Sequence, residues 1–150
     1  MNGEELRLER TFDAPREAVF EAWTSPEVMR RWWAAGPDWE TPVAEVDLRA
    51  GGRIRVSMAE PGGEPAYTFS GEYLEVSPPE RLVFTSVWER PDSGDAVSTV
   101  TVEFHADGDR TTVILIHRGL RSAESRASHA EGWEACLDNL QTRVLSGRPS

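Results

Sequence analysis

Residues 128–144 read SHAEGWEACLDNLQTRV, and their apolar positions recur with the period of an α-helix. The apolar face consists of Trp133, Leu137, Leu140 and Val144. Ser128 has the spacing of a capping box with Glu131, and Ser122 offers an alternative start further upstream. A helix from Ser128 to Ser146 would span roughly 28 Å, enough to cross several strands. We therefore expect a long C-terminal helix with one strongly apolar side.

The preceding residues, 41–118, change to an alternation of apolar and polar positions interrupted by turns. Six strands are expected here, at 43–48, 53–58, 67–76, 81–89, 97–104 and 111–117. Short loops separate consecutive strands, which predicts an antiparallel meander. A further strand is expected at the start of the chain, where Leu6, Leu8 and Phe12 lie among charged residues.

Two short helices are expected between this first strand and the meander. Pro15 fits the first turn of one helix, and Ser25-Pro26 marks the start of the second. The second helix is expected to include Trp32 and Trp33. The predicted fold is α+β, with a curved six- to seven-stranded antiparallel sheet wrapped around the C-terminal helix. Such a curved sheet rarely fills completely with side chains, which favours a ligand cavity against the helix.

The composition is that of one globular domain. The 150 residues are 39% hydrophobic and 28% charged, too apolar for a disordered acidic tail. Cys136 is the only cysteine, so it cannot form an internal disulfide. The opening residues, MNGEELRLER, carry charges where a signal peptide needs an apolar stretch. We expect a single domain over residues 1–150, located in the cytoplasm and not inserted in a membrane.

The charged residues exclude several classes of function. The net charge of −10 would repel a phosphate backbone, which argues against nucleic-acid binding. All 16 basic residues are arginines. Schiff-base catalysis and a phosphate-binding loop that ends in Gly-Lys both need a lysine, so neither is expected.

Five groups of residues resemble the motifs of START-like (SRPBCC) helix-grip proteins, in the branch homologous to the activator of the heat-shock chaperone ATPase. They are, in chain order, FDAPREAVFEAW (12–23) with SPE (25–27) and RWW (31–33), VDLRAGG (46–52), PPERLVFT (78–85), HRGL (117–120) and HAEGW (129–133). The resemblance covers nearly the whole chain and implies the helix-grip fold. The superfamily includes lipid and polyketide carriers, aromatase-cyclases, hormone receptors and chaperone stimulators, so the fold alone does not choose a function.

The candidate ligand-binding residues are mostly aromatic and are expected to face the cavity. They are Trp33, Trp39, Tyr67, Phe69, Phe84, Trp88, His117, Trp133, Leu137 and Leu140. The aromatic rings would supply contact area, and His117 would orient the ligand. A one-residue slip of strand register would move Tyr67 and Phe84 to the outer face.

Several candidate residues allow two interpretations. Trp32 and Trp33 either line a cavity or attach the short helices to the sheet. Gly132, inside a helix, indicates either close packing against a strand or contact with a ligand. His117 is either a structural histidine or a general base, and it could pair with Cys136 across the helix–sheet interface.

The function expected from these residues is binding of a small, largely hydrophobic ligand, such as a lipid, a polyketide or an aromatic molecule. One alternative is a chaperone-activator-like protein-interaction domain, and another is a cyclase-like or hydrolase-like enzyme that uses the same cavity. No cofactor and no metal site are expected, because the three histidines lack the short paired spacing of metal ligands. Pairing of edge strands into a homodimer is left open.

Overall fold

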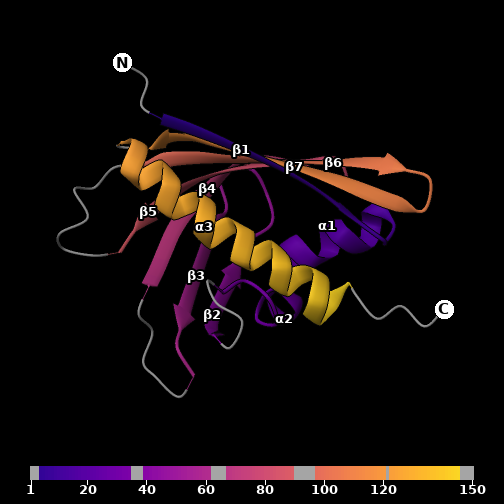
Figure 1. Ribbon diagram of the computed structural model, residues 1–150, viewed down its shortest axis with the longest axis horizontal. Coiled ribbons are helices and arrows are strands. Elements are labelled where there is room, and N and C mark those ends of the chain that lie inside the picture. Colours follow the sequence, from indigo (N-terminus) through magenta and orange to yellow (C-terminus); the bar gives the residue numbers. More distant parts are fainter. Residues whose placement is uncertain (1–3, 35–38, 62–66, 90–96, 121, 146–150) are drawn as a thin grey trace.

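The computed structural model describes residues 4–34, 39–61, 67–89, 97–120 and 122–145. In chain order the elements are β1 (Glu4–Phe12), α1 (Arg16–Thr24), α2 (Pro26–Met29), β2 (Glu40–Val46), β3 (Arg53–Ala59), β4 (Tyr67–Ser77), β5 (Arg81–Trp88), β6 (Ser98–Asp107), β7 (Arg110–Leu120), α3 (Ala123–Asn139) and the π-helical turn η1 (Leu140–Val144). Figure 1 shows α3 lying diagonally across one face of the sheet. The α+β architecture predicted from the sequence is confirmed.

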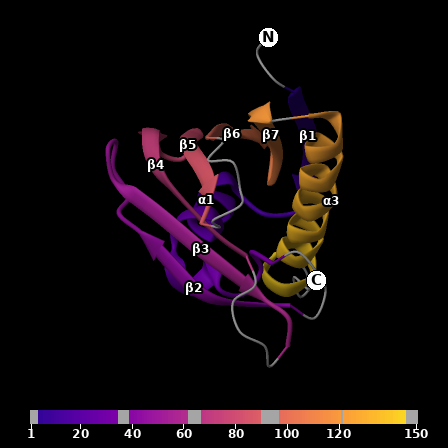
Figure 2. The same ribbon diagram turned by 90° about the vertical axis from the view of Figure 1, so that its left-hand side faces the viewer.

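The seven strands form one antiparallel sheet in the order β1-β7-β6-β5-β4-β3-β2. The meander therefore runs from β2 to β7, and β1 is added beside the last strand. Figure 2 shows the sheet curling from β1, next to α3, round to β3 and β2 on the opposite side. This curvature turns the sheet into a half-barrel whose inner face receives the helix.

β4 contains a close approach to β5 and, further along, a change of register. The register between β4 and β5 shifts between Tyr73 and Glu75. A Cβ atom at Gly71 would collide with the carbonyl oxygen of Thr85 in β5. Glycine therefore lets the two backbones approach closely just before the register of β4 changes.

The helices differ from the expected boundaries at two places. α3 starts at Ala123, and the Ser122 hydroxyl accepts a hydrogen bond from the Ser125 N–H at 3.0 Å. The upstream start is therefore the true one, and Ser128 lies within the helix. α2 ends at Met29 instead of continuing through Trp32 and Trp33. Two adjacent tryptophans cannot both point to the centre of one helical face, and leaving the helix lets both be buried.

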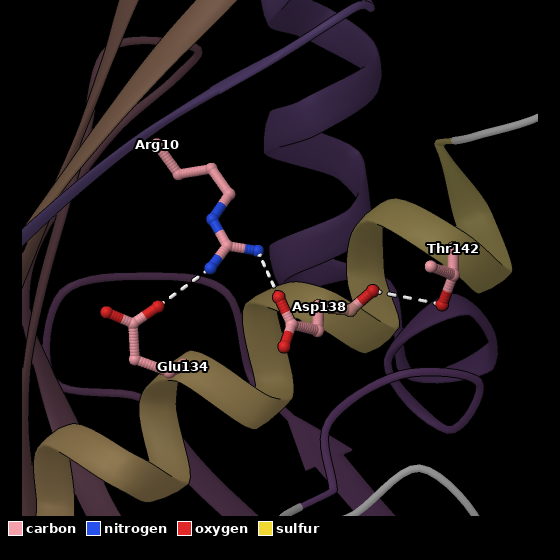
Figure 3. A network of polar contacts seen from close by, with 4 residues as sticks. All are labelled: Arg10, Glu134, Asp138 and Thr142. Carbon is pink, nitrogen blue, oxygen red and sulfur yellow. Dashed lines mark hydrogen bonds and ion pairs between the residues drawn. The ribbon is translucent and has the colours of Figure 1, made fainter.

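Arg10 anchors α3 to the edge of the sheet. It occupies an inward position of β1, opposite the buried Val113 of β7. Its guanidinium donates to Asp138 Oδ1 and to Glu134 Oε1, each at 2.7 Å, as Figure 3 shows. The Asp138 carbonyl in turn accepts from the Thr142 hydroxyl at 3.0 Å. Arg10 is a charged residue at a position of β1 where the alternation predicts an apolar one. Its guanidinium has one acidic partner on each of two successive turns of α3.

We predict that Arg10→Met lowers the free energy of unfolding by about 1 kcal/mol, since methionine keeps the apolar stem but loses two partly exposed ion pairs. The loss should shrink in 1 M salt because the acidic partners are exposed. Urea unfolding at both salt concentrations measures it. Arg7→Met is the matched control, because the ion pair of Arg7 among the described residues is with Glu9, on the exposed side of the same strand. Equal losses in both variants would contradict the anchoring role.

Candidate functional site

Aromatic side chains from the short helices, the sheet and α3 converge inside the half-barrel. Trp33 lies at the centre, and its ring centroid is 5.7 Å from Trp133 of α3 and 5.7 Å from Phe69 of β4. Phe84 of β5 is 6.3 Å from Trp33. Trp23 of α1 lies 5.2 Å from Trp33 and 5.8 Å from Trp133. We call these five residues the aromatic cluster.

The aromatic cluster also joins the short helices to the sheet. Trp32, which stacks on Trp33 at 5.1 Å, donates its indole N–H to the Ala22 carbonyl at 2.9 Å. The Thr41 hydroxyl of β2 donates to the Trp33 carbonyl at 2.8 Å. The interpretation of Trp32 and Trp33 as attachments between elements is therefore confirmed, and Trp33 also faces the interior of the half-barrel.

Most of the predicted ligand-binding residues lie together. Seven are buried on the inner face of the sheet, on α3 with η1, or between them: Trp33, Phe69, Phe84, His117, Trp133, Leu137 and Leu140. Trp39 is half-buried, and its carbonyl accepts from Arg143 at 3.2 Å. Tyr67 pairs with Met58 and Trp88 pairs with Phe69 through their backbones, but their side chains lie outside the described part of the structure. Phe84 faces inward, so the register slip considered for it does not occur.

His117 lies in a directional chain of hydrogen bonds that crosses from α3 into the sheet. The Trp133 indole N–H donates to His117 Nδ1 at 3.0 Å, so Nδ1 is the unprotonated nitrogen. The Nε2–H therefore donates to the Ser98 hydroxyl at 2.7 Å, and Ser98 donates to the Ser86 carbonyl at 3.2 Å. Both ring nitrogens are used, so His117 holds the Trp133 indole in place.

This environment keeps His117 neutral. Burial lowers the pKa of His117 to about 3, and the neighbouring His129 adds to the effect. A general base needs an available nitrogen and a pKa near neutrality. The structure therefore favours the structural role of His117 over that of a general base. Burial also raises the pKa of the Cys136 thiol to about 12, so Cys136 is not an activated nucleophile.

The low pKa of His117 predicts a dependence of stability on pH. Its folded pKa lies below the unfolded value near 6.5, so the unfolded chain takes up the proton first as pH falls. The contribution of neutral His117 to the unfolding free energy is therefore complete above pH 6.5, and it is lost progressively as the pH falls toward 3. Between pH 7.5 and pH 5 this group alone should cost about 2 kcal/mol of unfolding free energy.

Urea unfolding at pH 7.5 and pH 5 tests this expectation. The wild-type protein should lose about 2 kcal/mol more than His117→Asn between the two values. His105→Asn, which removes an exposed imidazole of β6, should behave like the wild type. A His117→Asn variant as sensitive to pH as the wild type would show that other groups cause the effect.

Small and polar residues lie around this hydrogen-bond chain. Ser86 and Ser98 lie on the sheet, and Ser125, His129 and Gly132 lie on α3. Gly132 is half-buried, yet a Cβ atom built on it would meet no atom of the described residues within 4 Å. Close packing of Gly132 against a strand, one of the two interpretations from the sequence, finds no support among the described residues. None of them packs against the flank of α3 that bears Gly132.

Two residues of this interior were not predicted. Trp23 and Tyr73 are both buried here, although the sequence analysis singles out neither as a ligand-binding residue. The period of two that selects Phe69 also selects Tyr73, four positions further along the strand, so a signal was present. The buried Trp23 Nε1 and Tyr73 hydroxyl have no hydrogen-bond partner among the described residues.

The described residues offer no metal centre and no membrane span. Nowhere among them do three histidine, cysteine, aspartate or glutamate side chains gather where they could hold a metal ion. Similarly, no helix in the described part of the chain is both long and apolar enough to cross a bilayer.

The fold and its interior can be compared with known proteins. The family model described as "Activator of Hsp90 ATPase homolog 1-like protein" matches residues 13–144. The chain belongs to this family. No curated protein matches the chain. The helix-grip resemblance drawn from the sequence motifs is thereby confirmed.

Solved structures of bacterial proteins share the architecture. The AHSA1 (SPO3351) protein from Silicibacter pomeroyi is 30% identical, with a TM-score of 0.79 over 92% of this chain and 95% of that chain. Protein CV1439 from Chromobacterium violaceum is 25% identical, with a TM-score of 0.83 over 96% and 98%. CalU16 from Micromonospora echinospora is 30% identical, with a TM-score of 0.67 over 91% of this chain and 73% of that chain.

Proposed function

We propose that the protein binds a small, largely hydrophobic molecule between α3 and the inner face of the curved sheet. The aromatic cluster supplies a large apolar contact surface at this place. Sites of this kind are concave, mostly apolar and equipped with a few polar groups. The small and polar residues near His117 and Gly132 would supply the polar end.

The observation that carries the proposal is that no described residue packs against Gly132. A glycine inside a helix costs roughly 1 kcal/mol relative to alanine. No atom of the described residues comes close enough to require that glycine. As far as the described residues go, the flank of α3 at Gly132 is uncovered, which entry of a ligand would need.

The remaining alternatives differ in their support. A cyclase-like or hydrolase-like reaction would need a base, and His117 is neutral with both nitrogens occupied. A chaperone-activator-like interaction is compatible with the family, and it would depend on the outer surface instead of the interior. Failure of all ligands in the experiment below would favour this second function.

Gly132→Leu tests the proposal directly. Leucine should fill the open space while improving helix propensity, so the unfolding free energy should stay unchanged or rise by up to about 1 kcal/mol. Binding should be lost. The measurement is a tryptophan-fluorescence titration of the wild-type and variant proteins with fatty acids, sterol-like and polyaromatic compounds, preceded by native mass spectrometry for a co-purifying ligand.

Ala127→Leu is the matched control, because Ala127 is exposed on the same helix. This variant should titrate like the wild type. Saturable binding that persists unchanged in Gly132→Leu would place the ligand elsewhere. The absence of any co-purifying mass and of any saturable response in the wild type would overturn the proposal.

A further inference from the structure

The interior contains two buried donors that the structure leaves without an acceptor. The Tyr73 side chain is fully buried, and its hydroxyl has no partner among the described residues. The Trp23 side chain is 1% exposed, and its indole N–H is also unpartnered among them. A buried donor that leaves water without gaining an acceptor destabilises the folded state. Two such donors in one small interior are unusual and need an explanation.

Both donors adjoin the centre of the aromatic cluster. The Trp23 ring meets Trp33 edge to face at 5.2 Å. The Tyr73 ring meets Phe84 edge to face at 6.0 Å, and Phe84 in turn contacts Trp33. Tyr73 also shares one inward register row with Phe84, Val100 and His117, across four adjacent strands. This row spans roughly 14 Å, the scale of a molecule with two or three fused rings.

The charge of the interior restricts the ligand further. Every polar side chain that is buried as a whole among the described residues is uncharged: threonine, serine, asparagine and neutral histidine. Arg16 also has a buried, unpartnered Nε, but it is half-buried, begins α1 and is not part of the aromatic cluster. A carboxylate placed here would lose its hydration without gaining a cation. Burial raises the pKa of the Tyr73 phenol, so the hydroxyl stays protonated and remains a donor.

We propose that the site takes an uncharged, planar aromatic molecule bearing a hydrogen-bond acceptor, such as a ring ketone, to which Tyr73 and Trp23 donate. This inference rests on the proposed function and specifies the class of ligand. Flat rings match the edge-to-face and stacked geometry of the aromatic cluster. An acceptor on the ligand removes the cost of the unmade hydrogen bonds, which gives selectivity against a pure hydrocarbon and against an anion.

Three probes of nearly the same shape separate these properties: 9-fluorenone carries a ketone, fluorene carries none, and fluorene-9-carboxylate is an anion. Equilibrium dialysis of the wild-type protein should rank fluorenone above fluorene by about 25-fold, which is about fivefold for each of two neutral hydrogen bonds, and the carboxylate last. Tyr73→Phe should lower fluorenone affinity about fivefold and leave fluorene affinity unchanged. Trp23→Phe, tested in the same way, examines the second donor.

Stability measurements show whether the Tyr73 hydroxyl contributes to the stability of the ligand-free protein. Tyr73→Phe should not lower the urea midpoint of the ligand-free protein, because the hydroxyl has no partner to lose. Thr111→Val is the control, since the equally buried Thr111 hydroxyl donates to the Ala14 carbonyl at 2.7 Å and its loss should lower the midpoint.

The outcomes separate the two proposals. Equal affinity for fluorenone and fluorene, or a fluorenone preference that survives both Tyr73→Phe and Trp23→Phe, would overturn the inference while leaving hydrophobic ligand binding intact. Preference for the carboxylate would also overturn it. If no probe binds, and the fatty-acid and sterol-like panel fails as well, the proposed function itself is wrong.

Discussion

Trp33 bridges the gap between α3 and the far side of the sheet, and the arrangement of the interior depends on this bridge. α3 lies closest to β1 and β7, where Arg10 anchors it. The strands on the other side curve away and are not covered by the helix directly, as Figure 2 shows. The indole of Trp33 spans this distance, with Trp133 on one side and Phe69 and Phe84 on the other.

The segment that carries Trp33 is not helical, so its backbone needs other partners. The C-terminal helix supplies them: Asn139 donates to the Ala34 carbonyl at 3.1 Å, and Arg143 donates to the Arg31 carbonyl at 3.3 Å. Arg31 returns a hydrogen bond to the Arg143 carbonyl at 2.9 Å. The last residue of α3 and Arg143 of η1 therefore hold the same segment whose tryptophan fills the interior. Carbonyl groups outside regular structure are satisfied by side chains from a distant part of the chain.

The fold could be predicted from the sequence because its signals are local and periodic. Alternation in the strands and the four-three-four spacing from Trp133 to Val144 are set by backbone geometry alone. The site was less predictable, because partners across elements leave no periodic trace. Nothing in the local sequence shows that Trp133 donates to His117, or that Arg10 reaches α3. Gly132 illustrates the limit: a glycine inside a helix indicates a constraint, but only the structure shows that no described residue packs against it.

The tryptophans of this interior are close enough to act as one optical unit. Ring centroids of Trp23, Trp32, Trp33 and Trp133 lie 4.9–5.8 Å from their neighbours in the group. At such separations the electronic transitions of the indoles couple, so excitation is shared among the rings and their circular dichroism bands split into pairs of opposite sign. The sign and size of that splitting depend on the angles between the rings. A displacement of Trp33 alone would therefore change the chiroptical spectrum of the whole group without any change in secondary structure.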